Sequence, residues 1–282
     1  MVVGVSGDRY DVMESRQASV GGVPVRWEER GQGPPVVFLH GIPTSPALWR
    51  HVVPLLDRAR CLAFEMVGYG ASIPAGRDRD ISVARQSDYL LDWLDELAIE
   101  RAILVGHDLG GGVAHIAAIR QPQRCAGLLL TNAVGYDSWP IPSVKALRAV
   151  SDVFARLHPR AVQPVLATLM VRGHDDLQLA RDAFAVHWRP YSEHDGAAAL
   201  ARQVTSLDVR DTLAVQDHIR ELDVPARVVW GAADQFQKVR YGERFAWDLG
   251  VELHRVEGAK HFVPEDHPHV LAGAVDELLA EW

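Results

Sequence analysis

Residues 101–111 read RAILVGHDLGG, and this stretch predicts a strand, a tight turn and a helix in succession. The apolar run 102–105 is typical of a buried strand, and it stops abruptly at Gly106. Two more glycines precede GVAHIAAIR, a segment of small residues with helical character. Asp108 occupies the centre of the turn. A carboxylate on a sharp corner after a buried strand is the first candidate for a functional side chain.

The rest of the chain alternates between strand-like and helix-like segments. Residues 23–29 alternate in the manner of an edge strand, and the solid apolar run 35–39 suits a strand buried on both faces. Further strands are predicted at 60–64, 126–131, 226–230 and 251–256, and amphipathic or helical segments at 47–56, 81–97 and 271–279. Such alternation favours an α/β fold with a mostly parallel sheet flanked by helices.

From about Tyr136 to His218 the alternation stops. This region is rich in Ala, Leu, Arg and His, has helical periodicity, and contains no clear buried strand. We therefore predict a core domain formed by residues 1–135 and 219–282, with a helical cap, residues 136–218, inserted in it.

Composition limits the classes of function. A chain of 282 residues with 48% hydrophobic and 23% charged residues is globular, and its net charge of −8 argues against a nucleic-acid partner. The stretch MVVGVSGDRYD carries charges and no apolar core, and no apolar run approaches membrane-spanning length, so a cytoplasmic protein without a membrane partner is expected. Cys61 and Cys125 are expected to be buried free thiols. The oligomeric state is left open, with a homodimer as one arrangement.

Three residues follow strands at the edge where open α/β sheets bind ligands. Asp108 follows one strand, Asp234 follows the next-to-last strand in WGAAD, and His261 follows the last strand in GAKHF. This chain order, nucleophile, acid and histidine, is that of α/β-hydrolases. With HGIP at 40–43 and GHDLG at 106–110, the chain resembles an α/β-hydrolase over essentially its whole length. The resemblance implies a triad of Asp108 as nucleophile, His261 as general base and Asp234 orienting His261.

Aspartate in place of serine changes the chemistry. A carboxylate is ionised at pH 7 and attacks saturated carbon well, so the expected substrate is a small molecule with a leaving group on an sp³ carbon. Asp108 would form an alkyl ester, and water activated by His261 would hydrolyse it. Backbone N–H groups of Ile42 and Leu109 would hold the oxyanion. Neither a metal nor an organic cofactor is expected.

The resemblance narrows to epoxide hydrolases and haloalkane dehalogenases, which share the aspartate elbow. Haloalkane dehalogenases are similar in PTSPALWR and HFVPEDHP but place a Trp after the nucleophile, with an Asn or second Trp, to bind halide; this chain has Leu109 and Ile42. Fluoroacetate dehalogenases carry Arg where Leu109 stands. The missing halide donors favour epoxide opening, with halide displacement as the alternative.

The cap offers several groups that could contact a leaving group. Epoxide hydrolases use cap tyrosines, for which Tyr136 and Tyr191 are candidates, with His187 as another donor. Trp139 and Trp188 could line an apolar pocket or donate N–H to halide. Tyr136 and Tyr191 could equally be packing residues, and packing is the default interpretation for the two tryptophans.

Other interpretations are kept open. A hydrolase-fold protein that binds a small molecule without turning it over is one, although binding needs no acid-oriented histidine. The cap stretch RPYSEHDGAAALARQV is also similar to that of some carbon–carbon bond hydrolases, which Asp108 speaks against. The polar runs 193–195 and 265–269 look like metal-binding clusters, but solvated surface is the expectation.

Overall fold

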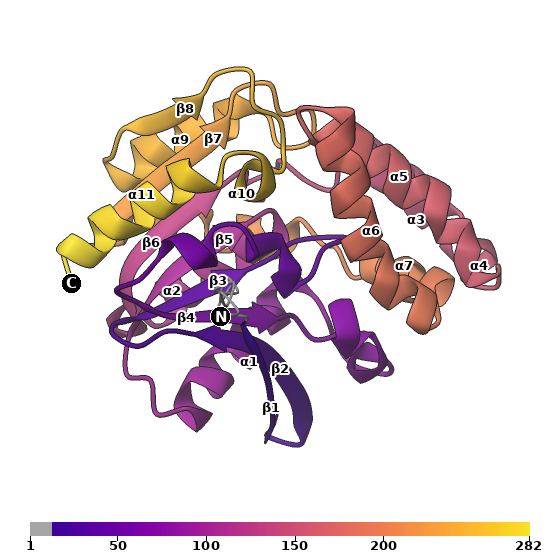
Figure 1. Cartoon of the computed structure of the whole chain (residues 1–282), viewed down its shortest axis with the longest axis horizontal. Helices are drawn as coiled ribbons and strands as arrows, with labels where there is room; N and C mark the ends of the chain where they lie inside the picture. The colour runs from indigo at the N-terminus through magenta and orange to yellow at the C-terminus, as the bar shows by residue number, and fades with distance from the viewer. Residues whose placement is uncertain (1–12) are drawn as a thin grey trace, which may run out of the picture.

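The computed structural model describes residues 13–282; residues 1–12, which include the stretch MVVGVSGDRYD, lie outside the described residues. An eight-stranded sheet runs in the order β1-β2-β4-β3-β5-β6-β7-β8 (Figure 1). Its strands are β1 (Glu14–Val20), β2 (Val23–Arg30), β3 (Pro35–Leu39), β4 (Arg60–Glu65), β5 (Ala102–His107), β6 (Cys125–Thr131), β7 (Ala226–Gly231) and β8 (Leu253–Val256). Neighbouring strands are parallel from β4 to β8, whereas β2 pairs antiparallel with both β1 and β4. The predicted mostly parallel α/β sheet is confirmed.

The prediction that residues 23–29 form an edge strand is wrong. β1 pairs along the whole of β2, from Val20 opposite Val23 to Glu14 opposite Glu29, and so takes the edge itself. β1 escapes pattern analysis because six of its seven residues are exposed or half-buried, leaving no apolar face to read. The amphipathic stretch 47–56 forms two short 3₁₀ helices, η1 (Pro46–Trp49) and η2 (Val53–Leu55), each with a proline in its first turn.

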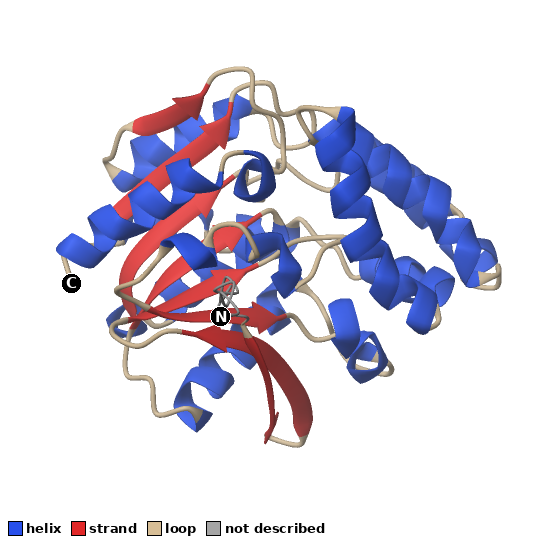
Figure 2. Cartoon of the chain, in the orientation of Figure 1, coloured by secondary structure: helices blue, strands red, loops and turns tan. Residues whose placement is uncertain are grey.

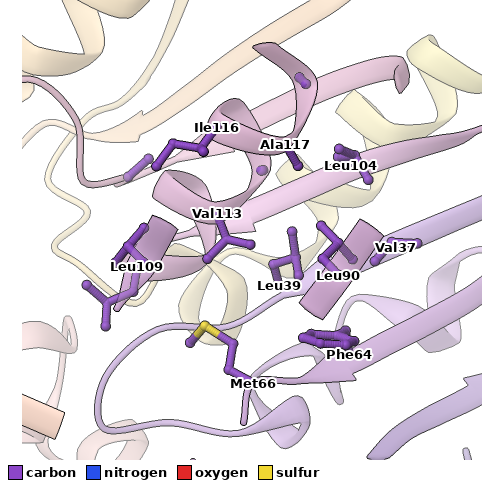
Figure 3. Close-up of a cluster of buried hydrophobic side chains, with 14 of the residues drawn as sticks. Val37, Leu39, Phe64, Met66, Leu90, Leu104, Leu109, Val113, Ile116 and Ala117 are labelled. Carbon is purple, nitrogen blue, oxygen red and sulfur yellow. The ribbon is translucent and has the colours of Figure 1, made fainter. Parts of the chain in front are cut away.

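Helices cover both faces of the sheet. One face packs against α1 (Val83–Glu96), α2 (Leu109–Arg120) and α9 (Val239–Leu249), and the other against α11 (Pro268–Ala280) with η1 and η2. In β3, Val37 and Leu39 belong to the first core and Val36 and Phe38 to the second. Figure 3 shows part of the first core, which contains Val37 and Leu39 of β3 together with Leu90 of α1 and Val113 of α2. Because the central strands are buried on both faces, they consist of consecutive apolar residues in the sequence.

The described chain between β6 and β7 contains helices and no strand (Figure 2). These helices are α3 (Pro142–Ala149), α4 (Ser151–Phe154), η5 (Pro159–Ala161), α5 (Val162–Gly173), α6 (Leu177–Glu193), α7 (Gly196–Thr205), α8 (Arg210–Leu213) and η6 (Gln216–Glu221). Most of them form the arm to the right of the sheet in Figure 1, which we call the cap. A small core of its own, including Leu166, Tyr191 and Leu200, holds the cap together.

Cys61 and Cys125 are buried free thiols, as predicted. Between residues 13 and 282, no helix has both the length and the apolar character needed to span a bilayer.

Substitution of Gly110 tests how closely α2 packs on the sheet. A Cβ atom on Gly110 would lie 2.2 Å from the Leu39 carbonyl oxygen, which belongs to the backbone of β3 and cannot move aside. We expect Gly110→Ala to lower the free energy of unfolding by about 2 kcal/mol or more. Gly273→Ala in α11 is the control, because a Cβ there meets nothing within 4 Å and should add about 0.5–1 kcal/mol. Urea denaturation of both variants measures this; equal stabilities would contradict the packing.

Candidate active site

Asp108 lies on a strained turn between β5 and α2. Its backbone has φ 50° and ψ −121°, in the left-handed half of dihedral space that residues other than glycine rarely adopt. The turn packs without space for side chains: a Cβ on Gly106 or Gly111 would lie within 2.5 Å of neighbouring atoms. Small flanking residues therefore allow the strand to turn directly into α2 with the carboxylate at the corner.

The loop after β3 faces the Asp108 carboxylate. The Ile42 N–H donates to Asp108 Oδ2 at 3.2 Å, and a Cβ on Gly41 would lie 2.5 Å from the same oxygen. The buried ring of His40 fixes this loop, because its Nδ1–H donates to the Gly41 carbonyl at 3.0 Å and its Nε2 accepts from Met66 N–H at 3.2 Å. Burial lowers the pKa of His40 to about 3, so the ring is neutral and keeps this pairing.

His261 and Asp234 form a buried pair. His261 Nδ1–H donates to Asp234 Oδ2 at 2.8 Å, and both residues are less than 5% exposed. Asp234 also accepts from Phe236 N–H at 2.6 Å and from Asn132 Nδ2 at 2.6 Å. Three hydrogen bonds therefore fix the Asp234 carboxylate, which in turn orients the His261 ring.

Asn132 is a site residue that sequence reasoning missed. It comes directly after β6 with φ 44°, and its Oδ1 accepts from Gly231 N–H at 3.1 Å. The side chain thereby ties the end of β6 to the end of β7 and to Asp234. A polar residue immediately after a buried strand was the available signal.

Burial and charge set the pKa values at the site. Burial raises the pKa of Asp108 from 3.8 to about 6, against the opposing effects of His261 and of the Ile42 and Leu109 N–H groups. Burial lowers the pKa of His261, but the carboxylates of Asp234 and Asp108 outweigh it and the net pKa is raised. The two side chains are therefore electrostatically coupled. His107, whose ring centre is 4.6 Å from that of His261, has a pKa well below its usual value because it is buried, so it stays neutral.

A cavity of about 370 Å³ opens onto Asp108 and His261 between the sheet and the cap. Its wall is mainly aliphatic, from Val134, Ile141, Val144, Leu147, Val165, Leu169, Leu200, Val204 and Leu207. Apart from Asp108 and His261, polar side chains come from Ser143, Gln237 and the indole of Trp139. Such a wall suits a small apolar molecule.

The cap tyrosines do not line this cavity. The Tyr136 hydroxyl donates to Asp248 Oδ2 at 2.9 Å, and its ring packs 4.8 Å from Phe245 on the core domain. The Tyr191 hydroxyl donates to Gln203 Oε1 at 2.7 Å inside the cap core. Both hydroxyls are therefore paired away from Asp108.

His187 also lies elsewhere. Its Nε2–H donates to Glu265 Oε1 at 2.9 Å, and the Glu265 carboxylate also pairs with Arg50 and, at 3.1 Å, with His174 Nε2. Asp266 accepts from His174 Nδ1–H at 2.6 Å. We call these five residues the cap tether, because His174 and His187 come from the cap and the others from the core. Burial lowers the pKa of His174, but Asp266 and Glu265 outweigh it and raise it to about 9.

The expectation that residues 265–269 are solvated surface is wrong for Glu265 and Asp266, whose side chains are at most 2% exposed. They are buried because α5 and α6 bring histidines over them. Residues 193–195 do lie mostly at the surface, where Glu193 pairs with Arg189. Among residues 13–282, no three His, Cys, Asp or Glu side chains are grouped so that they could hold a metal ion.

The two cap tryptophans differ. Trp188 is half-buried and stacks on Phe184 with a ring separation of 6.3 Å, away from the cavity. Trp139 lines the cavity, but its indole N–H donates to Thr212 Oγ1 at 2.8 Å. Of the five cap candidates, only Trp139 lines the cavity that contains Asp108.

The family model for the alpha/beta hydrolase fold matches residues 34–268. The chain belongs to the α/β-hydrolase family. This α/β-hydrolase is 40% identical over 276 residues to a haloalkane dehalogenase from Mesorhizobium japonicum, covering 90% of this chain and 86% of that protein. It is 29% identical to the 2-hydroxymuconate semialdehyde hydrolase of Pseudomonas sp. (strain CF600), with 94% of each chain covered.

A solved structure of an alpha/beta hydrolase fold protein from Burkholderia ambifaria superposes on this α/β-hydrolase with a TM-score of 0.86 at 28% identity. The match covers 93% of this chain and 97% of that chain. The likeness therefore extends over both the core domain and the cap.

The raised pKa of Asp108 predicts a stability change. The folded protein binds this proton more tightly than the unfolded chain does, so ionising Asp108 destabilises the fold, increasingly as pH rises from about 4 and fully above about 6. We expect Asp108→Asn to raise the free energy of unfolding by on the order of 1 to 3 kcal/mol at pH 7.5. The gain should shrink at pH 4.5. Thermal unfolding at the two pH values measures it, with exposed Asp92→Asn as control; a destabilised Asp108→Asn protein at pH 7.5 would contradict it.

Proposed function

We propose that this α/β-hydrolase displaces a leaving group from an sp³ carbon through Asp108 and hydrolyses the resulting ester with water activated by His261. One observation carries the proposal: a carboxylate, in contact with the Ile42 N–H, occupies the elbow in the same cavity as a buried His261–Asp234 pair. A binder that does no chemistry would need no such pair. A serine-type reaction, including carbon–carbon bond hydrolysis, would need a hydroxyl where Asp108 stands.

In the first step, an Asp108 carboxylate oxygen attacks the substrate carbon, and the bond to the leaving group breaks with its electron pair. In the second, His261 Nε2 takes a proton from water as the water oxygen attacks the ester carbonyl carbon. N–H groups of Ile42 and Leu109 stabilise the oxyanion. The tetrahedral intermediate then expels the alcohol oxygen, which receives the proton from His261. The second proton of the water is left on the Asp108 carboxyl group and passes to solvent, so that Asp108 is again a carboxylate.

The leaving group can be inferred from whether the cavity holds a side chain that can donate a proton to it. Opening an epoxide forms an alkoxide, a strong base that needs an acidic donor, whereas a halide is a very weak base and departs without a proton. No tyrosine lines the cavity among the described residues, and the hydroxyls of Tyr136 and Tyr191 are already donated elsewhere. The 40% identity to a haloalkane dehalogenase points the same way. We therefore propose halide displacement as the reaction, in place of the epoxide opening that the sequence favoured.

Gln237 is the best donor to a departing halide. Its side chain lines the cavity, the residue is 3% exposed, and neither its Oε1 nor its Nε2–H group has a hydrogen-bond partner among the described residues, so the Nε2–H group is free to donate. An unpaired buried amide is costly, so it is retained more readily where a ligand pairs with it. Its backbone is fixed because the carbonyl accepts from Trp230 Nε1 at 2.8 Å. We propose that the Gln237 amide N–H contacts the halide.

Epoxide opening is the second candidate. It is favoured by Ile42 and Leu109, whose aliphatic side chains stand where haloalkane dehalogenases carry halide-binding N–H groups. The two reactions leave different masses on Asp108, so one experiment separates them.

That experiment uses His261→Gln, which should form the ester but not hydrolyse it. After incubation with 1-bromohexane we expect an adduct on the Asp108 peptide equal to the bromoalkane minus hydrogen bromide, with one bromide released per protein. An adduct equal to the whole of 1,2-epoxyhexane, with none from bromohexane, would instead establish epoxide opening. The double variant Asp108→Asn/His261→Gln is the control and should remain unmodified. Absence of any adduct at Asp108 would overturn the proposed function.

The role of Gln237 is tested by leaving-group dependence. Gln237→Leu should slow formation of the ester by roughly ten- to a hundredfold with a chloroalkane, because a hydrogen bond to a charged group is lost. The effect should be smaller with the iodoalkane, whose leaving group needs less help. Gln235→Leu, an exposed neighbour outside the cavity, is the matched control. Equal slowing with chloride and iodide would mean that Gln237 does not contact the leaving group.

A further inference from the structure

A second hollow adjoins the reaction cavity. It has a volume of about 470 Å³ and shares four wall residues with the cavity: Pro140, Ile141, Ser143 and Phe236. These residues come from the start of the cap and from the loop that carries Asp234. The hollow therefore begins at the wall of the cavity that contains Asp108.

The hollow is strongly cationic in a protein whose net charge is −8. Lys145, Arg172, Lys238 and Arg240 contribute to its wall, against the single carboxylate of Asp137. That carboxylate is already occupied, because Asp137 Oδ1 accepts from the Tyr241 hydroxyl at 3.1 Å. The chain has only three lysines, and two of them lie here.

The four cations are not neutralised by partners. All four are exposed, and none forms an ion pair with a carboxylate among residues 13–282. Two of them rest on aromatic rings instead. The Arg172 guanidinium lies 5.3 Å from the centre of Phe236, and that of Arg240 lies 4.9 Å from the centre of Tyr241. These contacts hold positive charge at the rim without cancelling it.

Two helices begin at the hollow. α3 starts at Pro142 and α9 at Val239, and neither has an acidic residue in its first turn or a side chain capping its N-terminus. Helix N-termini carry partial positive charge and free N–H groups that favour anions. The backbone and the side chains therefore favour the same sign of ligand.

We propose that this hollow binds an anionic group of the substrate while the apolar part of the same molecule fills the cavity and presents its electrophilic carbon to Asp108. The inference rests on the proposed function and names its substrate class, an organic anion carrying a halogen on an sp³ carbon. A carboxylate suits the combination of arginine and lysine donors. Neutral haloalkanes would use the cavity alone.

Kinetics of bromide release test the proposal with matched substrates. We expect wild type to prefer 6-bromohexanoate over 6-bromohexanol in kcat/KM by about tenfold, the magnitude that two partly exposed charge interactions supply. Lys145→Gln/Lys238→Gln should remove this preference, chiefly through KM, and leave the alcohol within about twofold of wild type. Added salt should weaken the preference only in wild type.

Arg58→Gln is the control for loss of positive charge. Arg58 is exposed and precedes β4, at the amino end of the parallel strands and so on the edge of the sheet opposite Asp108. This variant should keep the preference for the carboxylate. Equal kcat/KM for both substrates in wild type, or equal losses for both in the double lysine variant, would overturn the anion site.

A binding readout separates this inference from the proposed reaction. Hexanoate, which has no leaving group, should protect Lys145 and Lys238 of wild type from an amine-acylating reagent, followed by peptide mass spectrometry, whereas 1-hexanol should not. Lys260 serves as internal reference, because its Nζ donates to the His174 carbonyl at 2.6 Å outside the hollow. Protection without turnover or ester formation would leave the anion site standing and remove the proposed reaction. Turnover without protection would do the reverse.

Discussion

Asp108 sits on a turn that packs against the end of β3 so closely that neither Gly41 nor Gly110 has room for a Cβ atom. This close approach brings the Ile42 N–H to the carboxylate and forces the strained backbone of the elbow. Strain of this kind persists only where the surroundings hold it, and here the surroundings are a sheet buried on both faces. The rest of the site is arranged around that fixed carboxylate.

The second constraint is electrostatic and holds the cap over the sheet. In the cap tether, the Glu265 carboxylate receives His187 and Arg50 and pairs with His174, although burial alone would raise its pKa. The net result is a pKa well below the usual value, so the charge persists in the interior. Breaking one partner of such a cluster leaves a buried charge uncompensated, which is strongly unfavourable. The wall contributed by the cap is thereby fixed relative to His261, four residues from Glu265.

In the proposed reaction, the cavity and the hollow would recognise the substrate by two kinds of force. The aliphatic wall would select by exclusion of water, which also strengthens every electrostatic interaction made with Asp108. The cationic hollow, in contact with solvent, would select by charge at a rim where screening keeps each contribution modest. Although the chain is acidic overall, a local positive rim would concentrate anions near the hollow.

The sequence by itself determined the parallel sheet, because strands buried on both faces must be apolar throughout, and it singled out Asp108, Asp234 and His261 because polar residues after such strands share one edge. It did not determine β1, whose exposed residues carry no pattern, or the role of Asn132. Only the tertiary structure decided where Tyr136 and His187 point, since their partners Asp248 and Glu265 lie 112 and 78 residues away. A polar side chain takes the partner that folding brings within 3 Å, and no local spacing encodes that choice.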